Sequence, residues 1–228
     1  MLAEKYGAPG DVQKWKERAG KLRDGIISSF WIPEKKYFGA YYINEPVNML
    51  YEGYETLGES LAVLEGIVPG GDDHDVLGAV GPGRWGTSVV APQLSGVRPY
   101  HNDAVWPFVQ AYRCLALKKA GDYALCEKEF ASAAYAASLF RTFIENYTAS
   151  SCDKDGTELS SDRQLWSVAA WLSLMYRVIC GIDFTQAGLS VHPLVFDSFT
   201  KGITLADFNW SGSTLDLSIS GTGSEIAS

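Results

Sequence analysis

Hydrophobic residues recur at helical spacing along the first part of the chain. One amphipathic stripe begins at Val12 and ends at Ile32-Pro33, because a proline disfavours helical geometry in the residue before it. The aromatic run from Tyr37 to Ile43 then predicts an extended segment. A second helix is predicted to begin at Thr56, since Thr56-Leu-Gly-Glu59 has the spacing of a capping box. The Gly- and Pro-rich sequence that follows predicts one short helix, around residues 75–80.

Three more helices are predicted farther along. A helix tolerates proline only in its first turn, so Pro107 fixes the start of one helix, which ends at Gly121, a typical C-terminal cap. Another is predicted from about Asp122 to Tyr147. A third follows the capping box Ser161-Asp-Arg-Gln164. Apolar residues occur nearly all round this third helix, so we expect it to be internal.

Beyond Gly181 the spacing of hydrophobic residues changes from helical to alternating. Three stretches alternate in this way, namely 189–191, 203–205 and 214–220. They predict short strands of an antiparallel sheet. Gly221-Thr-Gly223 then predicts a hairpin turn whose return strand would have to continue past Ser228.

The order of these elements predicts a mainly α fold. We expect helical hairpins over residues 1–181 and a small antiparallel β remnant over residues 182–228. A chain of 228 residues with 46% hydrophobic and 20% charged residues has the length and composition of a globular protein with a sizeable core.

The net charge of the chain narrows the classes of molecule that it is expected to bind. A formal net charge of -8, with no basic run, argues against nucleic acid and against an anionic membrane surface. No segment reaches the roughly 18 apolar residues of a membrane span, and the N-terminus lacks the apolar core of a signal peptide. We therefore expect a soluble chain, and the sequence does not assign its compartment.

The cysteines predict neither a disulfide framework nor a metal site. Cys114, Cys126, Cys152 and Cys180 lack paired C-x-x-C spacing and are too few for a disulfide-stabilised scaffold. We expect buried free thiols. Residues 72–75 could hold a metal, and residues 151–162 loosely resemble a calcium-binding loop, but a solvated acidic loop and ordinary turn chemistry explain them more simply. No metal or other cofactor is therefore predicted.

The segment from Arg98 to Phe108 concentrates the candidate chemistry. It places aromatic, amide, imidazole and carboxylate groups immediately before the helix that begins at Pro107. Its candidate substrate-binding residues are Tyr100, His101, Asn102, Asp103 and Trp106. Aromatic faces pack against the C–H faces of sugar rings, so Trp106 and the earlier Trp85 are candidate sugar platforms. His101 and Asp103 are candidates to orient sugar hydroxyls, although an aspartate at a helix start is also a common N-cap.

Three segments together resemble one family. They are Tyr100-His-Asn-Asp-Ala-Val-Trp-Pro-Phe108, Phe143-Ile-Glu-Asn-Tyr147, and Ser161-Asp-Arg-Gln-Leu-Trp-Ser167 running into Tyr176-Arg-Val178. In order and separation they are similar to the six-hairpin glycosidases, in particular the glycogen-debranching-related branch with its glucosidase I-like and mannosylglycerate hydrolase-like enzymes. The resemblance implies a partial (α/α)6 toroid and a glycoside hydrolase that acts on oligo- or polysaccharides.

The resemblance also implies a catalytic residue. In that family two carboxylates cleave the glycosidic bond, usually with inversion, and Glu145 matches the general base. A predicted place in the last turn of its helix would put this carboxylate at the negative end of the helix dipole, at a cost of up to about 1 kcal/mol. The family's general acid is an Asp in an earlier aromatic loop, and nothing here matches it. We therefore expect the C-terminal portion of such an enzyme.

Two other classes of function remain open. The chain is alternatively a non-catalytic carbohydrate-binding or assembly fragment, associated with a second copy or with a missing N-terminal half. A sugar epimerase built on an α/α barrel would need paired histidines over its pocket, and His74, His101 and His192 predict no such pair.

Overall fold

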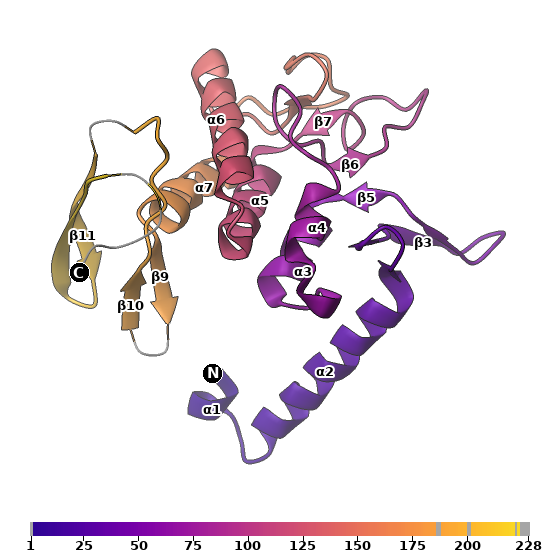
Figure 1. Cartoon of the computed structure of the whole chain (residues 1–228), viewed down its shortest axis with the longest axis horizontal. Helices are drawn as coiled ribbons and strands as arrows, with labels where there is room; N and C mark the ends of the chain where they lie inside the picture. The colour runs from indigo at the N-terminus through magenta and orange to yellow at the C-terminus, as the bar shows by residue number, and fades with distance from the viewer. Residues whose placement is uncertain (1, 186–187, 200–201, 222, 224–228) are drawn as a thin grey trace.

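The fold mixes α and β structure. The computed structural model describes residues 2–185, 188–199, 202–221 and 223, and it is 42% helical and 22% strand. The prediction of a mainly α fold is therefore wrong. Figure 1 shows the reason: strand pairs lie in the connections between the helices as well as at the C-terminal end.

Four of the helices pack against one central helix. In chain order they are α1 (Leu2–Tyr6), α2 (Asp11–Phe30), α3 (Thr56–Glu65), α4 (Asp73–Gly78), α5 (Pro107–Ala120), α6 (Tyr123–Phe140) and α7 (Leu165–Ser173). A short 3-10 turn, Pro69–Gly71, precedes α4, and a π-helical segment, Leu174–Ile179, continues α7. Helix α5 packs against α3, α4, α6 and α7. The predicted limits of α5 at Pro107 and Gly121 are confirmed.

Twelve strands form six antiparallel pairs in the part of the chain that is described. The pairs are β1 (Trp31–Ile32) with β2 (Tyr37–Phe38), β3 (Tyr41–Ile43) with β4 (Met49–Tyr51), β5 (Tyr54–Glu55) with β6 (Val90–Ala91), β7 (Ala104–Val105) with β8 (Tyr147–Thr148), β9 (Ile182–Thr185) with β10 (Gly188–Val191), and β11 (Ile203–Trp210) with β12 (Ser213–Ile219). The first four pairs contain strands of two or three residues, which are too short to show an alternating pattern in the sequence. The strands predicted over 189–191 and 214–220 are confirmed to within one residue at each end, whereas the strand predicted over 203–205 continues to Trp210.

The core runs along α5 and continues into the C-terminal segment. Cys114, Ala116 and Leu117 of α5 are fully buried, and Leu194 and Phe196 belong to the same hydrophobic cluster. The segment that contains Leu194 and Phe196 therefore shares a core with the helices. All four cysteines are buried free thiols, as predicted.

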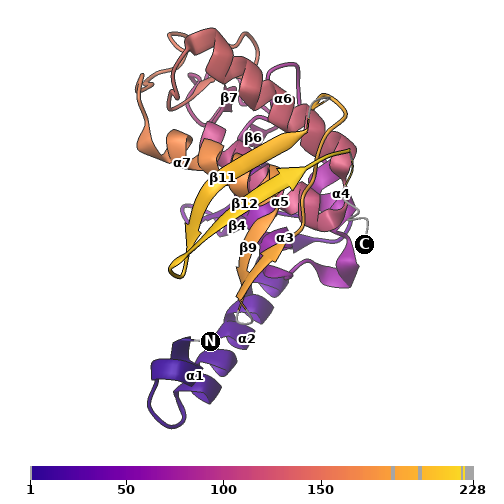
Figure 2. The same cartoon turned by 90° about the vertical axis from the view of Figure 1, so that its left-hand side faces the viewer.

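Two helices are more exposed than their sequences predict. Helix α2 buries none of its residues, and in both Figure 1 and Figure 2 it extends away from the helices that pack around α5. Helix α7 is not internal, because Leu165, Trp166 and Leu172 are exposed. A hydrophobic stripe indicates what a helix can bury, and in these two helices only part of the stripe packs against other described residues.

Neither predicted capping box forms. Glu55 is the N-cap of α3 and accepts hydrogen bonds from the backbone N–H groups of Leu57 and Gly58. Thr56 instead donates its hydroxyl to the Ser88 carbonyl, so the first pattern marks the helix start but not its cap. Helix α7 begins after Gln164, whose side chain makes no capping hydrogen bond.

Helix α6 ends earlier than predicted. It stops at Phe140 because Arg141 has a left-handed backbone conformation (φ 54°), which ends helical hydrogen bonding. Glu145 therefore lies in a loop. The expected interaction of its carboxylate with the negative end of a helix dipole does not occur.

Two successive lysines bind the ends of two other helices. Lys118 donates to the carbonyls of Arg177 and Val178 at the end of the π-helical segment, 2.9 Å each, and also to that of His192. Lys119 donates to Val63 and Leu64 at the end of α3. Burial lowers the pKa of Lys118 to about 8.

The predicted C-terminal hairpin lies largely outside the described residues. Gly223 is described, and it forms an isolated antiparallel bridge with Val195.

Candidate functional site

The loop before α5 and the loop after α6 meet at one end of these helices. Strands β7 and β8 pair Ala104 with Thr148, and the Ala149 N–H donates to the Asp103 carbonyl at 2.9 Å. This pairing brings Glu145 next to the Tyr100 loop. The Tyr100 hydroxyl donates to Oε1 of Glu145 at 3.2 Å.

Glu145 is held by a second segment of the chain. Its Oε2 accepts a hydrogen bond from the Ser161 N–H at 3.0 Å, and its own N–H donates to the Ser161 carbonyl at 2.8 Å. Glu145 is 7% exposed. Each carboxylate oxygen thus has one donor and retains a further lone pair for a water molecule or a substrate hydroxyl.

Tyr100 remains a hydrogen-bond donor over a wide pH range. Burial and the neighbouring Glu145 carboxylate raise the pKa of its phenol. The Trp106 indole N–H donates to the Tyr100 carbonyl at 2.6 Å, and the two rings meet edge to face with centroids 5.1 Å apart. Trp106 therefore fixes the loop that presents Tyr100.

His101 is exposed beside these rings. Its imidazole lies parallel to Trp106, with ring centroids 5.3 Å apart and an interplanar angle of 6°. It is therefore available to bind a ligand hydroxyl.

Glu55 also belongs to this region, although no sequence pattern predicts it there. Burial raises the pKa of Glu55, whereas hydrogen bonds from Gly58 and Leu57 and the charge of His101 lower it. Glu55 is thus close enough to His101 for an electrostatic interaction. A glutamate at the start of a helix is an ordinary N-cap, and this is why the sequence alone does not indicate its place at the site.

Asn102 shapes the loop and is not free to bind substrate. Its amide oxygen accepts from the Leu94 N–H at 2.6 Å, and its amide nitrogen donates to the carbonyls of Leu94 and Val97 at 3.1 and 3.0 Å. The side chain is buried. Its direct contacts are therefore with the protein backbone.

Asp103 is likewise bound by neighbouring protein groups. Its carboxylate accepts from the N–H and the hydroxyl of Ser150, at 2.9 and 2.6 Å, and its N–H donates to the Gln93 side chain. Its left-handed backbone (φ 44°) turns the chain into β7. Asp103 is not the N-cap of α5, because Trp106 occupies that position.

The two candidate sugar platforms differ in position. Trp106 is 4% exposed and is covered by its aromatic neighbours. Trp85 lies instead between Arg84, whose guanidinium carbon is 4.5 Å from the ring centroid, and Tyr135 at 5.2 Å. Neither indole presents an open face beside Glu145.

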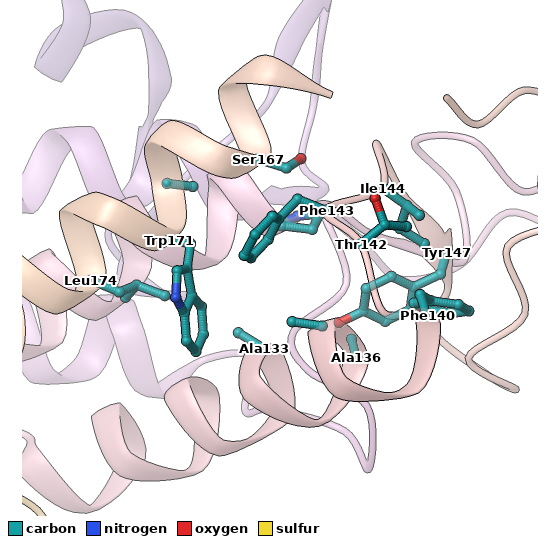
Figure 3. A pocket seen from close by; sticks show the side chains of 13 residues that line it. Ala133, Ala136, Phe140, Thr142, Phe143, Ile144, Tyr147, Ser167, Trp171 and Leu174 are labelled. Carbon is teal, nitrogen blue, oxygen red and sulfur yellow. The ribbon is translucent and has the colours of Figure 1, made fainter. Parts of the chain in front are cut away.

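A cavity beneath the Glu145 loop is too small for a sugar. Figure 3 shows it between Phe143, Ile144, Trp171 and Ser167, and its volume is about 20 Å³. That volume is comparable to one water molecule. The Ser167 hydroxyl is buried there, and the described residues offer it no hydrogen-bond partner.

Within the described ranges, no group of three or more His, Cys, Asp or Glu side chains is placed to hold a metal ion. In the acidic loop before α7, the Lys154 ammonium lies 2.8 Å from Asp155 and 3.2 Å from Asp162.

The described helices include no candidate for a membrane-spanning segment.

Comparison with known proteins assigns no family. No family model matches the sequence, and no curated protein matches it significantly.

Proposed function

We propose that this chain is part of a carbohydrate-active glycoside hydrolase, in which Glu145 is the general base. The observation that carries the proposal is the hydrogen bond between Tyr100 and Glu145. It joins a carboxylate to an aromatic, polar loop from which the exposed His101 side chain is available to a sugar. The substrate is an oligo- or polysaccharide.

The proposed reaction is hydrolysis with inversion of configuration. Glu145 removes a proton from water as the water attacks the anomeric carbon, and a general acid protonates the departing oxygen. Such an acid and base are separated by about 6.5–9.5 Å to leave room for the water. We assign the acid to a part of the complete enzyme other than the matched segments.

A glycosyl fluoride tests the base without the acid, because fluoride departs without being protonated. We expect the chain to hydrolyse a glycosyl fluoride slowly, and Glu145→Gln to lower the rate by about 100-fold or more. Aryl glycosides depend more on protonation of the leaving group by an acid. The wild-type chain should therefore hydrolyse them no faster than Glu145→Gln does. The α- and β-fluorides of glucose and mannose, followed by fluoride release and by NMR of the product anomer, make a suitable panel.

The control is Glu34→Gln, which changes an exposed glutamate in a different turn. Equal fluoride release by the wild type and Glu145→Gln would exclude a base role for Glu145. Aryl-glycoside turnover that depends on Glu145 would instead show that an acid is present among these residues.

A second candidate function is a non-catalytic carbohydrate-binding fragment. The burial of Glu145, with a donor on each carboxylate oxygen, favours it, because such a carboxylate can also serve only to hold two loops together. This alternative predicts sugar binding with no fluoride release.

A further inference from the structure

Trp166, at the start of α7, is a large aromatic side chain that is both exposed and held in place. Its ring stacks on Phe108 with centroids 4.6 Å apart and an interplanar angle of 24°, and it meets Trp106 edge to face at 5.6 Å. Even so, Trp166 is 42% exposed. Phe108 covers one face of the indole, so the exposed part lies away from Phe108.

The exposed indole lines a hollow between α3, α5 and α7. The hollow has a volume of about 440 Å³ and is lined largely by apolar side chains, among them Leu57, Phe108 and Tyr112. Ser173 and Arg177 add polar groups. Ligand sites typically have volumes of about 300–1,000 Å³ and combine apolar and aromatic walls with a few polar groups.

The hollow is connected to the Glu145 site through two ring contacts. Trp166 contacts Trp106, Trp106 contacts Tyr100, and the Tyr100 hydroxyl binds Glu145. Protein rings therefore fill the space between Trp166 and Glu145. A single sugar ring stacked on Trp166 is consequently a different ring from one that reacts at Glu145.

We propose that Trp166 is a platform for a pyranose ring of an oligosaccharide, at a distance from the sugar unit that meets Glu145. The inference rests on the proposed function and narrows its substrate to chains of several sugar units. Sugar rings present C–H faces that pack on an aromatic face. Ser173 and Arg177, whose guanidinium also lies 3.7 Å from Asp183, add polar groups that can bind sugar hydroxyls. Trp166 is thus the sugar platform in place of Trp106, for which that role was predicted.

Calorimetric titration with malto-, manno-, cello- and xylo-tetraoses tests this platform. Trp166→Ala should weaken binding of the preferred oligosaccharide about tenfold, and Trp166→Phe should weaken it less because a stacking ring remains. Trp15→Ala is the matched control, since Trp15 is also exposed but lies on the distant end of α2. It should bind as the wild type does.

A second measurement avoids the risk that Trp166→Ala does not fold. In protein labelled with 5-fluorotryptophan, the ¹⁹F resonance that is missing from Trp166→Phe belongs to Trp166, and the oligosaccharide should shift it. An unshifted Trp166 resonance, no binding by the wild type, or unchanged binding by Trp166→Ala would each overturn the inference. So would a dimer that covers Trp166.

The outcomes separate this inference from the proposed function. Oligosaccharide binding that depends on Trp166, without Glu145-dependent fluoride release, would retain the platform and remove the catalytic role. Fluoride release that depends on Glu145, with oligosaccharide binding unaffected by Trp166→Ala, would retain the catalytic role of Glu145 and remove the platform.

Discussion

Glu59, in the first turn of α3, is a buried acid whose pKa is shifted well above its usual value. Its Oε1 accepts the Phe38 N–H at 2.9 Å, whereas its Oε2 has no hydrogen-bond partner among the described residues. Burial raises its pKa from 4.5 to about 9. Glu59 is therefore protonated in the folded protein at neutral pH and ionised in the unfolded chain.

Glu59 should make the protein less stable as the pH rises. Between about pH 4.5 and 9 the folded state holds one proton more than the unfolded state at this residue, so the free energy of unfolding falls with pH. We expect Glu59→Gln, which stays neutral, to flatten this dependence and to raise stability at pH 8 by a few kcal/mol. Urea unfolding at a series of pH values measures both effects.

The matched control is Glu65→Gln, an exposed glutamate at the end of the same helix. Equal slopes of stability against pH for Glu59→Gln and the wild type would contradict the prediction.

Single residues show what a sequence pattern leaves undetermined. Pro107 was enough to predict that residues 100–103 form a loop, because a helix tolerates proline only in its first turn. That loop is the one that binds Glu145. The choice between Trp106 and Trp166 was not predictable, since both stand at the start of a helix and differ in which neighbours cover them. Burial of an aromatic ring is decided by segments that are distant in the sequence.

At the scale of elements, α5 and α6 are joined by a fully buried ion pair. Arg113 Nε lies 3.5 Å from Oε2 of Glu129, and neither side chain is exposed. The Arg113 guanidinium also donates to the carbonyls of Leu77 and Val80, at 2.8 and 2.7 Å, which attaches the end of α4 to α5. Glu129 accepts from the N–H and hydroxyl of Thr87.

Removing either charge of this pair should strongly destabilise the protein. Glu129→Gln leaves the guanidinium buried without its counter-ion, and Arg113→Met leaves the carboxylate in the same state. We expect each to lower the free energy of unfolding by about 3–5 kcal/mol. The double variant should lose less than the sum of the two, because it buries no unpaired charge. Denaturant unfolding of the wild type, the two single variants and the double variant measures these losses. If the loss in the double variant equals the sum of the two single losses, the two charges do not interact as described.

The ends of a helix were predictable where a single residue restricts or frees the backbone at that position. Pro107 and Gly121 bound α5 as expected, because one lacks an N–H and the other readily adopts a left-handed conformation. The end of α6 was not predictable, since Arg141 is an ordinary helix former that adopts a left-handed conformation here.

For the whole molecule, α2 is the least supported helix. Trp15 and Leu22 are exposed, and its contacts with the main core come from Ile26, Ile27 and Phe30 at its C-terminal end. Helical stability in proteins comes mostly from packing of an apolar face. The helix is thus attached at one end only.

Backbone amides from Trp15 to Leu22 should exchange with deuterium much sooner than those of Cys114 and Leu117 in α5. Local opening of an unpacked helix requires little free energy, whereas a core helix exchanges near the global limit. Hydrogen exchange followed by mass spectrometry compares the two. Protection of α2 that grows with protein concentration would instead indicate that a second copy covers it.

The class of the whole fold was the least predictable property. The alternating stretches after Gly181 reported the longer strands, but pairs such as β5 with β6 join residues far apart in the sequence. Their pairing depends on how α3 and α5 pack, and no local pattern records that. A helical spacing alone therefore overestimated the share of α structure.

The lysines at the end of α5 attach it to two neighbouring elements that line the hollow beside Trp166. Adjacent residues of a helix point about 100° apart, so Lys118 and Lys119 hold the C-terminal carbonyls of two separate neighbours, α3 and the continuation of α7. At the opposite end, the rings of Trp166 and Phe108 are in contact through stacking alone. Besides their side-chain packing, the three helices are thus joined by hydrogen bonds at the lysine end of α5 and by aromatic contacts at the Trp166 end.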